Sequence, residues 1–200
     1  MITQVARLLI ASAFLGASAV AIAAPAVGDV PPPRVGFDLS GEPVLLTSFS
    51  GKAIVVSFWA TWCAYCLKEL PILHNIQRTA GKDSMQVIAV NTESREVFRK
   101  AARTLKELDV LHAHDNSYQV QDTYGVKGIP HMVIVGRDGR VVAVYTGYSE
   151  SSLDGIVADI NRALAAPKPP SEGESAVVRG TAAALGGKIN DARMEERSRK

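Results

Sequence analysis

The chain has 200 residues, which is enough for one domain of ordinary size with short extensions but not for two full domains. Hydrophobic residues make up 47% of it and charged residues 21%, which excludes both a disordered protein and a multi-span membrane protein. A net charge of only +2 provides no basic face, so nucleic-acid binding is not expected.

The first 24 residues are predicted to be a signal peptide for export. Arg7 is the last charged residue before Asp29, and residues 8–24 are rich in Ala, Leu, Val and Ile. A basic start followed by a short apolar run and small residues is typical of a cleaved secretory signal. The alternative is an uncleaved membrane anchor, because the run is at the short limit of about 17 residues needed to span a bilayer. In both cases the rest of the chain is expected in an oxidising compartment, the periplasm.

Residues 35–165 are predicted to form one α/β domain. Short apolar runs rich in β-branched residues, at 53–59 and 86–90, are typical of central strands that are covered on both faces. A helical stretch follows each run, at 63–78 and at 94–107. This alternation of strand and helix predicts parallel strands joined by right-handed crossovers.

The domain is predicted to end in a hairpin and a helix. An Asp-Gly pair in the turn 137–140 separates the apolar runs 132–135 and 141–145, which is a strong hairpin signal. Apolar residues at helical spacing over 153–164 predict a closing helix. The fold class is therefore α/β, with a mixed sheet and helices on both faces. Residues 166–200 are rich in Pro, Ser, Gly and charged residues, and a disordered tail is expected there.

The two cysteines, Cys63 and Cys66, lie directly after the first predicted central strand, where a helix begins. Unpaired amides in the first turn of a helix favour a thiolate at Cys63 and lower the pKa of this thiol. The pair can form a short disulfide, so that Cys63 attacks a substrate disulfide and Cys66 then displaces the product. The alternatives are a structural disulfide and half of a metal site. However, so small a loop stabilises little, and a zinc site would need further ligands at partner spacing.

Glu69 is the most informative neighbour of the cysteines. At about 100° per residue it falls on the same flank of the helix as Cys66, within the apolar stripe. Burial there would raise the pKa of the carboxyl group and let it accept a proton from Cys66. The alternative is a surface glutamate, tolerated because Pro71 is expected to kink the helix.

Two segments carry a resemblance to a known family. They are 58–71, FWATWCAYCLKELP, and 126–130, VKGIP. Together they resemble the TlpA/ResA type of exported, thioredoxin-like thiol-disulfide oxidoreductase, and the similarity covers residues 35–165. It implies a thioredoxin fold with an extra N-terminal hairpin, formed by residues around 41–44 and 46–52.

The resemblance also assigns roles to individual residues. Glu69 becomes the proton acceptor for Cys66. Pro130 is expected to be cis and to pack against the cysteine pair, while the backbone of Ile129 pairs with an extended substrate strand. The expected catalytic residues are Cys63, Cys66 and Glu69, and the expected substrate-binding residues are Trp62, Ile129 and Pro130.

Three residues depart from the pattern of that family. Tyr65 stands where proline is frequent, so the turn between the cysteines is less rigid. Ser57 stands where cytosolic thioredoxins have a buried aspartate, which leaves proton transfer to Glu69. His131 follows Pro130, where threonine is common; it supports the thiolate, contacts substrate or is an incidental exposed side chain.

Metal binding has weak support. His112 and His114 would lie on one face of a strand as a pair of imidazole ligands, but histidines without a metal are far commoner. A Cu(I) chaperone would use both cysteines and a third ligand such as His131 or Met132. No resident metal and no cofactor are therefore expected.

The sequence thus predicts an exported, monomeric oxidoreductase that reduces selected protein disulfides with electrons from a membrane donor. The resemblance implies haem-attachment cysteines of apocytochrome c, or the cysteines of a copper centre, as substrates. The alternatives are a dithiol oxidase that uses the same cysteines in reverse, and the Cu(I) chaperone.

Overall fold

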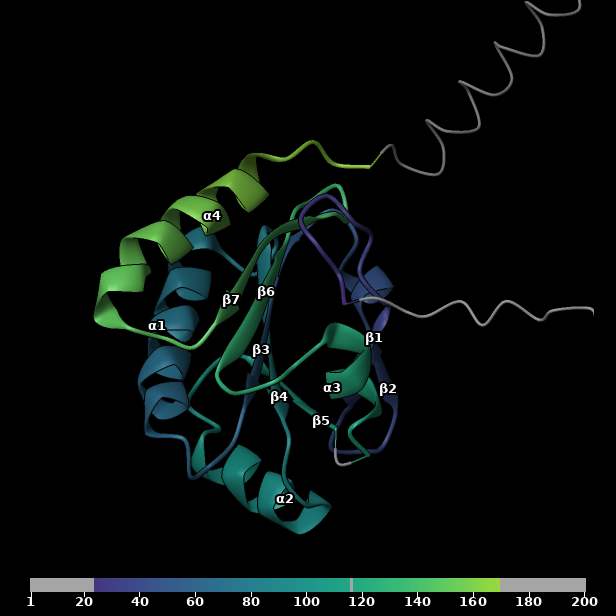
Figure 1. Cartoon of the computed structure of the whole chain (residues 1–200), viewed down its shortest axis with the longest axis vertical. Coiled ribbons are helices and arrows are strands. Elements are labelled where there is room, and N and C mark those ends of the chain that lie inside the picture. The colour runs from purple at the N-terminus through teal and green to yellow at the C-terminus, as the bar shows by residue number, and fades with distance from the viewer. Residues whose placement is uncertain (1–23, 116, 170–200) are drawn as a thin grey trace, which may run out of the picture.

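The computed structural model describes residues 24–115 and 117–169, in which seven strands alternate with four α-helices and two 3₁₀ helices (Figure 1). The predicted signal peptide, apart from residue 24, and the predicted tail from residue 170 onward lie outside these residues. None of the helices in the described part of the chain is both long and apolar enough to cross a membrane. In chain order the elements are β1 Arg34–Phe37, β2 Pro43–Leu45, η1 Leu46–Phe49, β3 Ala53–Trp59, α1 Ala64–Ala80, β4 Met85–Asn91, α2 Arg95–Thr104, β5 Leu111–His114, α3 Gln119–Tyr124, β6 His131–Val135, β7 Val141–Thr146, η2 Glu150–Ser152 and α4 Leu153–Ala165.

All seven strands form one sheet in the order β2-β1-β5-β4-β3-β6-β7. β3 pairs in parallel with β4, and β4 with β5, whereas the other neighbours are antiparallel. Every residue of β3 is buried, as its largely apolar sequence predicts for a strand covered on both faces. The predicted α/β class and the mixed sheet are therefore confirmed.

Helices cover both faces of this sheet, as predicted. Figure 1 shows α1 and α4 on one side of the sheet and α3 on the other. Leu73 of α1, Ile156 of α4 and Val55 of β3 share one hydrophobic cluster. On the opposite face, Tyr124 of α3 packs against Phe58 of β3, with ring centroids 5.5 Å apart. Alternation of side chains along β3 thus directs odd-numbered residues toward α1 and even-numbered residues toward α3.

The extra N-terminal hairpin is present, with boundaries that differ from those expected. β1 pairs antiparallel with β2 and, at its other edge, with β5. The stretch 46–52 begins with a 3₁₀ helix rather than a strand. Because residues three apart share one side of such a helix, Leu46 and Phe49 both reach the hydrophobic core.

The predicted second hairpin and the closing helix are also found. β6 and β7 pair around a turn in which Gly139 has a φ of +80°, a conformation that favours glycine.

The segment 24–33, ahead of the predicted start of the domain, is hydrogen-bonded to this hairpin. The amide of Gly28 donates to the carbonyl of Val141 at 2.8 Å, and the amide of Val141 donates to the carbonyl of Asp29 at 2.9 Å.

The short helix α3 is an element that the sequence does not predict. It has six residues and buries only Val120 and Tyr124, which lie one turn apart. Two apolar positions are too few to establish a helical period. The helix is stabilised instead by its packing on the sheet, where Val120 and Tyr124 both join the core.

Candidate active site

The end of β3 places both cysteines at the start of α1. Cys63 is the N-cap residue of this helix, and its Sγ accepts a hydrogen bond of 3.2 Å from the amide of Cys66. The two sulfurs are joined in a disulfide. Cys63 keeps 6% of its surface exposed, whereas Cys66 is fully buried. Cys63 is therefore the more accessible of the two cysteines.

Glu69 lies one turn after Cys66, on the buried side of α1, with 2% of its surface exposed. Its Oε1 accepts a hydrogen bond of 2.7 Å from the Ser57 hydroxyl of β3, and its Oε2 has no hydrogen-bond partner among the described residues. Burial raises the pKa of Glu69 from 4.5 to about 7, although the bond from Ser57 acts in the opposite direction. The burial inferred from helical spacing is confirmed, and the alternative of a surface glutamate is wrong.

The Ile129–Pro130 peptide bond is cis, as the resemblance implies. Pro130 is buried at the start of β6, and its carbonyl accepts a hydrogen bond of 2.7 Å from the amide of Gly147. The side chain of Ile129 packs against the cluster that contains Cys63 and Cys66. The amide and carbonyl of Ile129 form no backbone hydrogen bond with another described residue. They are therefore available to an incoming strand.

Two exposed aromatic side chains flank Cys63 in the sequence. Trp62 is 72% exposed and Tyr65 is 60% exposed, although aromatic residues are usually buried to a large extent. The Lys68 ammonium group lies 5.9 Å from the centre of the Tyr65 ring. Trp59, in contrast, is 1% exposed and belongs to the core. Exposed apolar surface next to Cys63 favours contact with a protein rather than with water alone.

A groove of about 450 Å³ lies beside the cysteine pair, between α1 and α2. Its apolar lining includes Leu67, Val97, Ala101 and Leu105, and Lys100 also lines it. Ala101 and Leu105 pack in the same cluster as both cysteines, so the groove is continuous with the site. It offers space for side chains that flank a substrate disulfide.

His131 is buried, whereas one alternative in the sequence analysis was an incidental exposed side chain. It lies opposite Phe58 in the pairing of β3 with β6, and its ring packs edge-on against Phe58 with centroids 6.0 Å apart. Its side chain is therefore on the face of the sheet away from Ser57 and Glu69. Only 4% of the residue is exposed, and burial lowers the pKa of the imidazole. The prediction of an exposed imidazole is wrong because the register of β6 turns this residue into the core.

The other candidate metal ligands are occupied or buried. His112 and His114 share a face of β5, but the Nε2 of His114 lies 2.8 Å from the Glu93 carbonyl and its ring stacks on Phe98. Met132 is 1% exposed, within the cluster beneath α1 and α4. Within residues 24–115 and 117–169, no group of three or more His, Cys, Asp or Glu side chains is arranged to hold a metal ion. The structure thus gives no support to an imidazole pair or to a third copper ligand.

One contact of the site was not expected from the sequence. Thr61, two residues before Cys63, is hydrogen-bonded to the carboxylate of Glu93. Glu93 follows the end of β4, and the carboxyl ends of parallel strands meet at one edge of a sheet. The polar residue Glu93, directly after a strand parallel to β3, was the signal that could have identified this contact.

Comparison with known proteins identifies the family. A family profile described as Redoxin matches residues 23–164. The chain belongs to the Redoxin family. Thiol-disulfide oxidoreductase ResA of Bacillus thuringiensis subsp. konkukian (strain 97-27) is 28% identical over 121 residues, which cover 60% of this chain and 70% of that protein. ResA of Geobacillus thermodenitrificans (strain NG80-2) is 30% identical over 122 residues, which cover 61% and 70%.

A solved structure supports the same conclusion for this Redoxin-family chain. The thioredoxin domain of a thiol-disulfide oxidoreductase from Bacteroides vulgatus aligns with a TM-score of 0.57 and 27% identity, covering 68% of this chain and 99% of that one. The predicted thioredoxin fold and TlpA/ResA type are therefore confirmed. The chain is a thiol-disulfide oxidoreductase with a closely spaced cysteine pair.

Proposed function

We propose that this Redoxin-family oxidoreductase is exported to the periplasm and reduces selected disulfides of protein substrates. One arrangement carries the proposal: the less buried Cys63, the fully buried Cys66 and the buried carboxyl group of Glu69 follow one another at the start of α1. The apolar stretch 8–24 supports export.

The reaction begins with both cysteines reduced. The Cys63 thiolate attacks one sulfur of the substrate disulfide, a bond forms between Cys63 and that sulfur, and the other substrate sulfur leaves as a thiolate. Glu69 then accepts the proton of the Cys66 thiol, and the Cys66 thiolate attacks the sulfur of Cys63. The second substrate sulfur leaves, and the enzyme is oxidised to the Cys63–Cys66 disulfide. A dithiol donor in the membrane must return the two electrons.

The surface around the sulfur supports a protein segment as substrate. An extended segment could pair with the backbone of Ile129, whose amide and carbonyl form no backbone hydrogen bond with another described residue, and so bring its disulfide over Cys63. Trp62 and Tyr65, close to Cys63 in the sequence, offer exposed apolar contacts. We propose the haem-attachment cysteines of apocytochrome c, or the cysteines of a copper centre, as the class of substrate.

Glu69 favours the reductase over the dithiol oxidase. In the reduced pair, an ionised Glu69 carboxylate near Cys66 disfavours a negative charge on the Cys66 sulfur. This favours the disulfide relative to the reduced pair. The reduction potential is lowered as a result, which suits an electron donor to substrates. A strong oxidase needs the opposite, a stabilised reduced form.

The equilibrium between the cysteine pair and glutathione tests this direction. We expect a reduction potential near or below that of thioredoxin, about −270 mV. The Glu69→Gln variant should have a higher potential, because the charge that disfavours the Cys66 thiolate is removed. A value near that of strong oxidases, about −120 mV, would contradict the reductase proposal.

A further inference from the structure

The carboxylate of Glu93 is bonded to the turn that leads from β3 to Cys63. The amide of Thr61 donates to Oε2 of Glu93 at 2.6 Å, and the Thr61 hydroxyl donates to Oε1 at 2.9 Å. Both oxygens of one carboxylate are thus used on a single residue, two positions before the reactive sulfur. Hydrogen bonds to an ionised acceptor are shorter and stronger than neutral ones.

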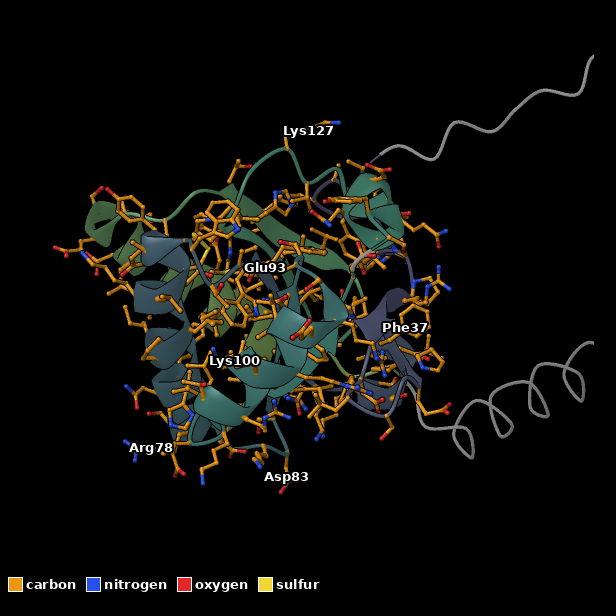
Figure 2. All side chains as sticks on the ribbon, turned by 90° about the horizontal axis from the view of Figure 1, so that it is seen from below. Phe37, Arg78, Asp83, Glu93, Lys100 and Lys127 are labelled. Carbon is orange, nitrogen blue, oxygen red and sulfur yellow. A yellow bond between two sulfur atoms is a disulfide. The ribbon has the colours of Figure 1, made fainter. Side chains whose placement is uncertain are left out.

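Glu93 is itself held by the sheet. The side chain of Asn91, fully buried at the end of β4, donates to Oε2 of Glu93 at 3.2 Å and accepts from the Glu93 amide at 3.0 Å. The Glu93 carbonyl lies 2.8 Å from Nε2 of the buried His114, whose ring stacks on Phe98 of α2. Figure 2 shows Glu93 near the start of α2. Glu93 is therefore held by β4 through its carboxylate and by β5 through its backbone carbonyl, while the carboxylate contacts the turn before α1.

The turn has few other attachments. The Cys63 amide donates to the carbonyl of Ala60, which closes the turn on itself. Within the described part of the chain, Trp62 takes part in no backbone hydrogen bond outside the regular elements. Apart from the bond that the Leu67 amide donates to the Cys63 carbonyl, the bonds from Thr61 to Glu93 connect this turn to the rest of the fold.

We propose that Glu93 is a positioning residue for thiol-disulfide exchange. By holding Thr61, it keeps the Cys63 sulfur at the N-terminus of α1, where it faces the Cys66 amide. In the disulfide form the covalent bond to Cys66 also holds this sulfur, whereas in the dithiol form only the turn and the hydrogen bonds from the Cys66 and Leu67 amides to Cys63 do. The reduced enzyme thus depends on Glu93 for a stabilised thiolate and for correct approach to a substrate disulfide. This inference concerns exchange itself and holds for reduction and oxidation alike.

Three variants separate positioning from charge. Glu93→Gln keeps the length of the side chain, and its oxygen can accept from the Thr61 amide while its NH₂ group donates to the Thr61 hydroxyl. Glu93→Asp keeps the charge but is one methylene too short to reach. Glu93→Ala removes both the charge and the hydrogen bonds to Thr61. The reduced proteins are assayed for their rate of reaction with oxidised glutathione and for the pKa of Cys63, from the pH dependence of alkylation.

We expect the Ala and Asp variants to react about tenfold more slowly, with a raised pKa of Cys63, and the Gln variant to react nearly as the natural protein does. Glu96→Ala, at an exposed position of the neighbouring α2, serves as a control with an unchanged rate. If Asp is active and Gln is not, the charge matters and positioning is overturned. If all variants keep the exchange rate and the Cys63 pKa, and only lose free energy of unfolding equally in both redox forms, Glu93 is merely structural and the proposal fails.

Discussion

At the scale of single residues, the pKa of Glu69 depends on two opposing contributions, its burial and its hydrogen bond from Ser57. Burial raises its pKa to about 7, and the hydrogen bond from Ser57 limits that rise. A carboxyl group accepts a proton only when it is ionised, so Glu69 can deprotonate Cys66 only above its own pKa. The release of substrate from Cys63 should therefore become faster as the pH rises through about 7.

Replacing Ser57 by Ala should move this pH dependence. Loss of the hydroxyl removes the bond that lowers the pKa of Glu69, so the midpoint of the release rate shifts to higher pH while the maximal rate stays similar. Glu69→Gln should instead slow release about 100-fold and abolish the midpoint. Stopped-flow measurement of glutathione release from its mixed disulfide with Cys63, over a range of pH, gives the midpoint and the maximal rate for both variants. An unshifted midpoint in the Ser57 variant would contradict the role given to this bond.

Among the elements, α1 has two tasks, which lie at different points along its buried face. It continues through Pro71 to Ala80, and Pro71 lies on the exposed side. The buried side carries Cys66 and Glu69 near its start and Leu73 further on. The first part of the helix therefore serves the chemistry, and the later part packs on the sheet together with α4.

The closing helix α4 offers a test of the packing without changing the site. Ile160 is 1% exposed in the cluster beneath α4, so Ile160→Ala should cost about 2 to 5 kcal/mol of unfolding free energy. Val157, on the same helix, is 38% exposed, and Val157→Ala should cost less than about 1 kcal/mol. Denaturant unfolding of the oxidised protein gives both values. Equal losses for the two variants would show that α4 does not pack as described.

At the scale of the whole molecule, exposed apolar side chains gather around the reactive sulfur. Trp62, Tyr65 and Leu67 are three of the nine large hydrophobic residues of the described chain that are exposed, and they fall within six positions of the sequence. The remaining six are spread from the N-terminal segment to α4. This concentration makes the start of α1 the face that a protein substrate would contact.

A Cys66→Ala variant should identify the substrates of this face. Without Cys66 the mixed disulfide at Cys63 cannot be released, so substrates remain covalently bound. Expressed as the full chain, the variant should yield adducts with exported proteins that disappear on reduction and are missing in Cys66→Ala/Cys63→Ala. Mass spectrometry of the adducts names the partners. Absence of adducts in the export compartment would contradict both export and the substrate class.

Much of the fold was accessible from the sequence because its signals are local. The Asp-Gly turn predicts the hairpin of β6 and β7, and apolar spacing predicts α4. The position of Cys63 and Cys66 at the end of a strand and the start of a helix needs only neighbouring residues. The helical position of Glu69 likewise predicts that it is buried. Such signals fail for α3, whose two buried residues gain their stability from the sheet.

The sequence by itself determined which residues carry the sulfur chemistry, since a strand, a turn and a helix start are decided by neighbours along the chain. The tertiary structure alone decided which partners they meet. Glu93 bonds to Thr61 from 32 positions away, and His131 enters the core because β6 pairs with β3 in one register. A shift of one residue would turn that imidazole to the face of Glu69, since side chains alternate along a strand. Strand register and loop contacts of this kind depend on the packing of distant segments, which no local pattern records.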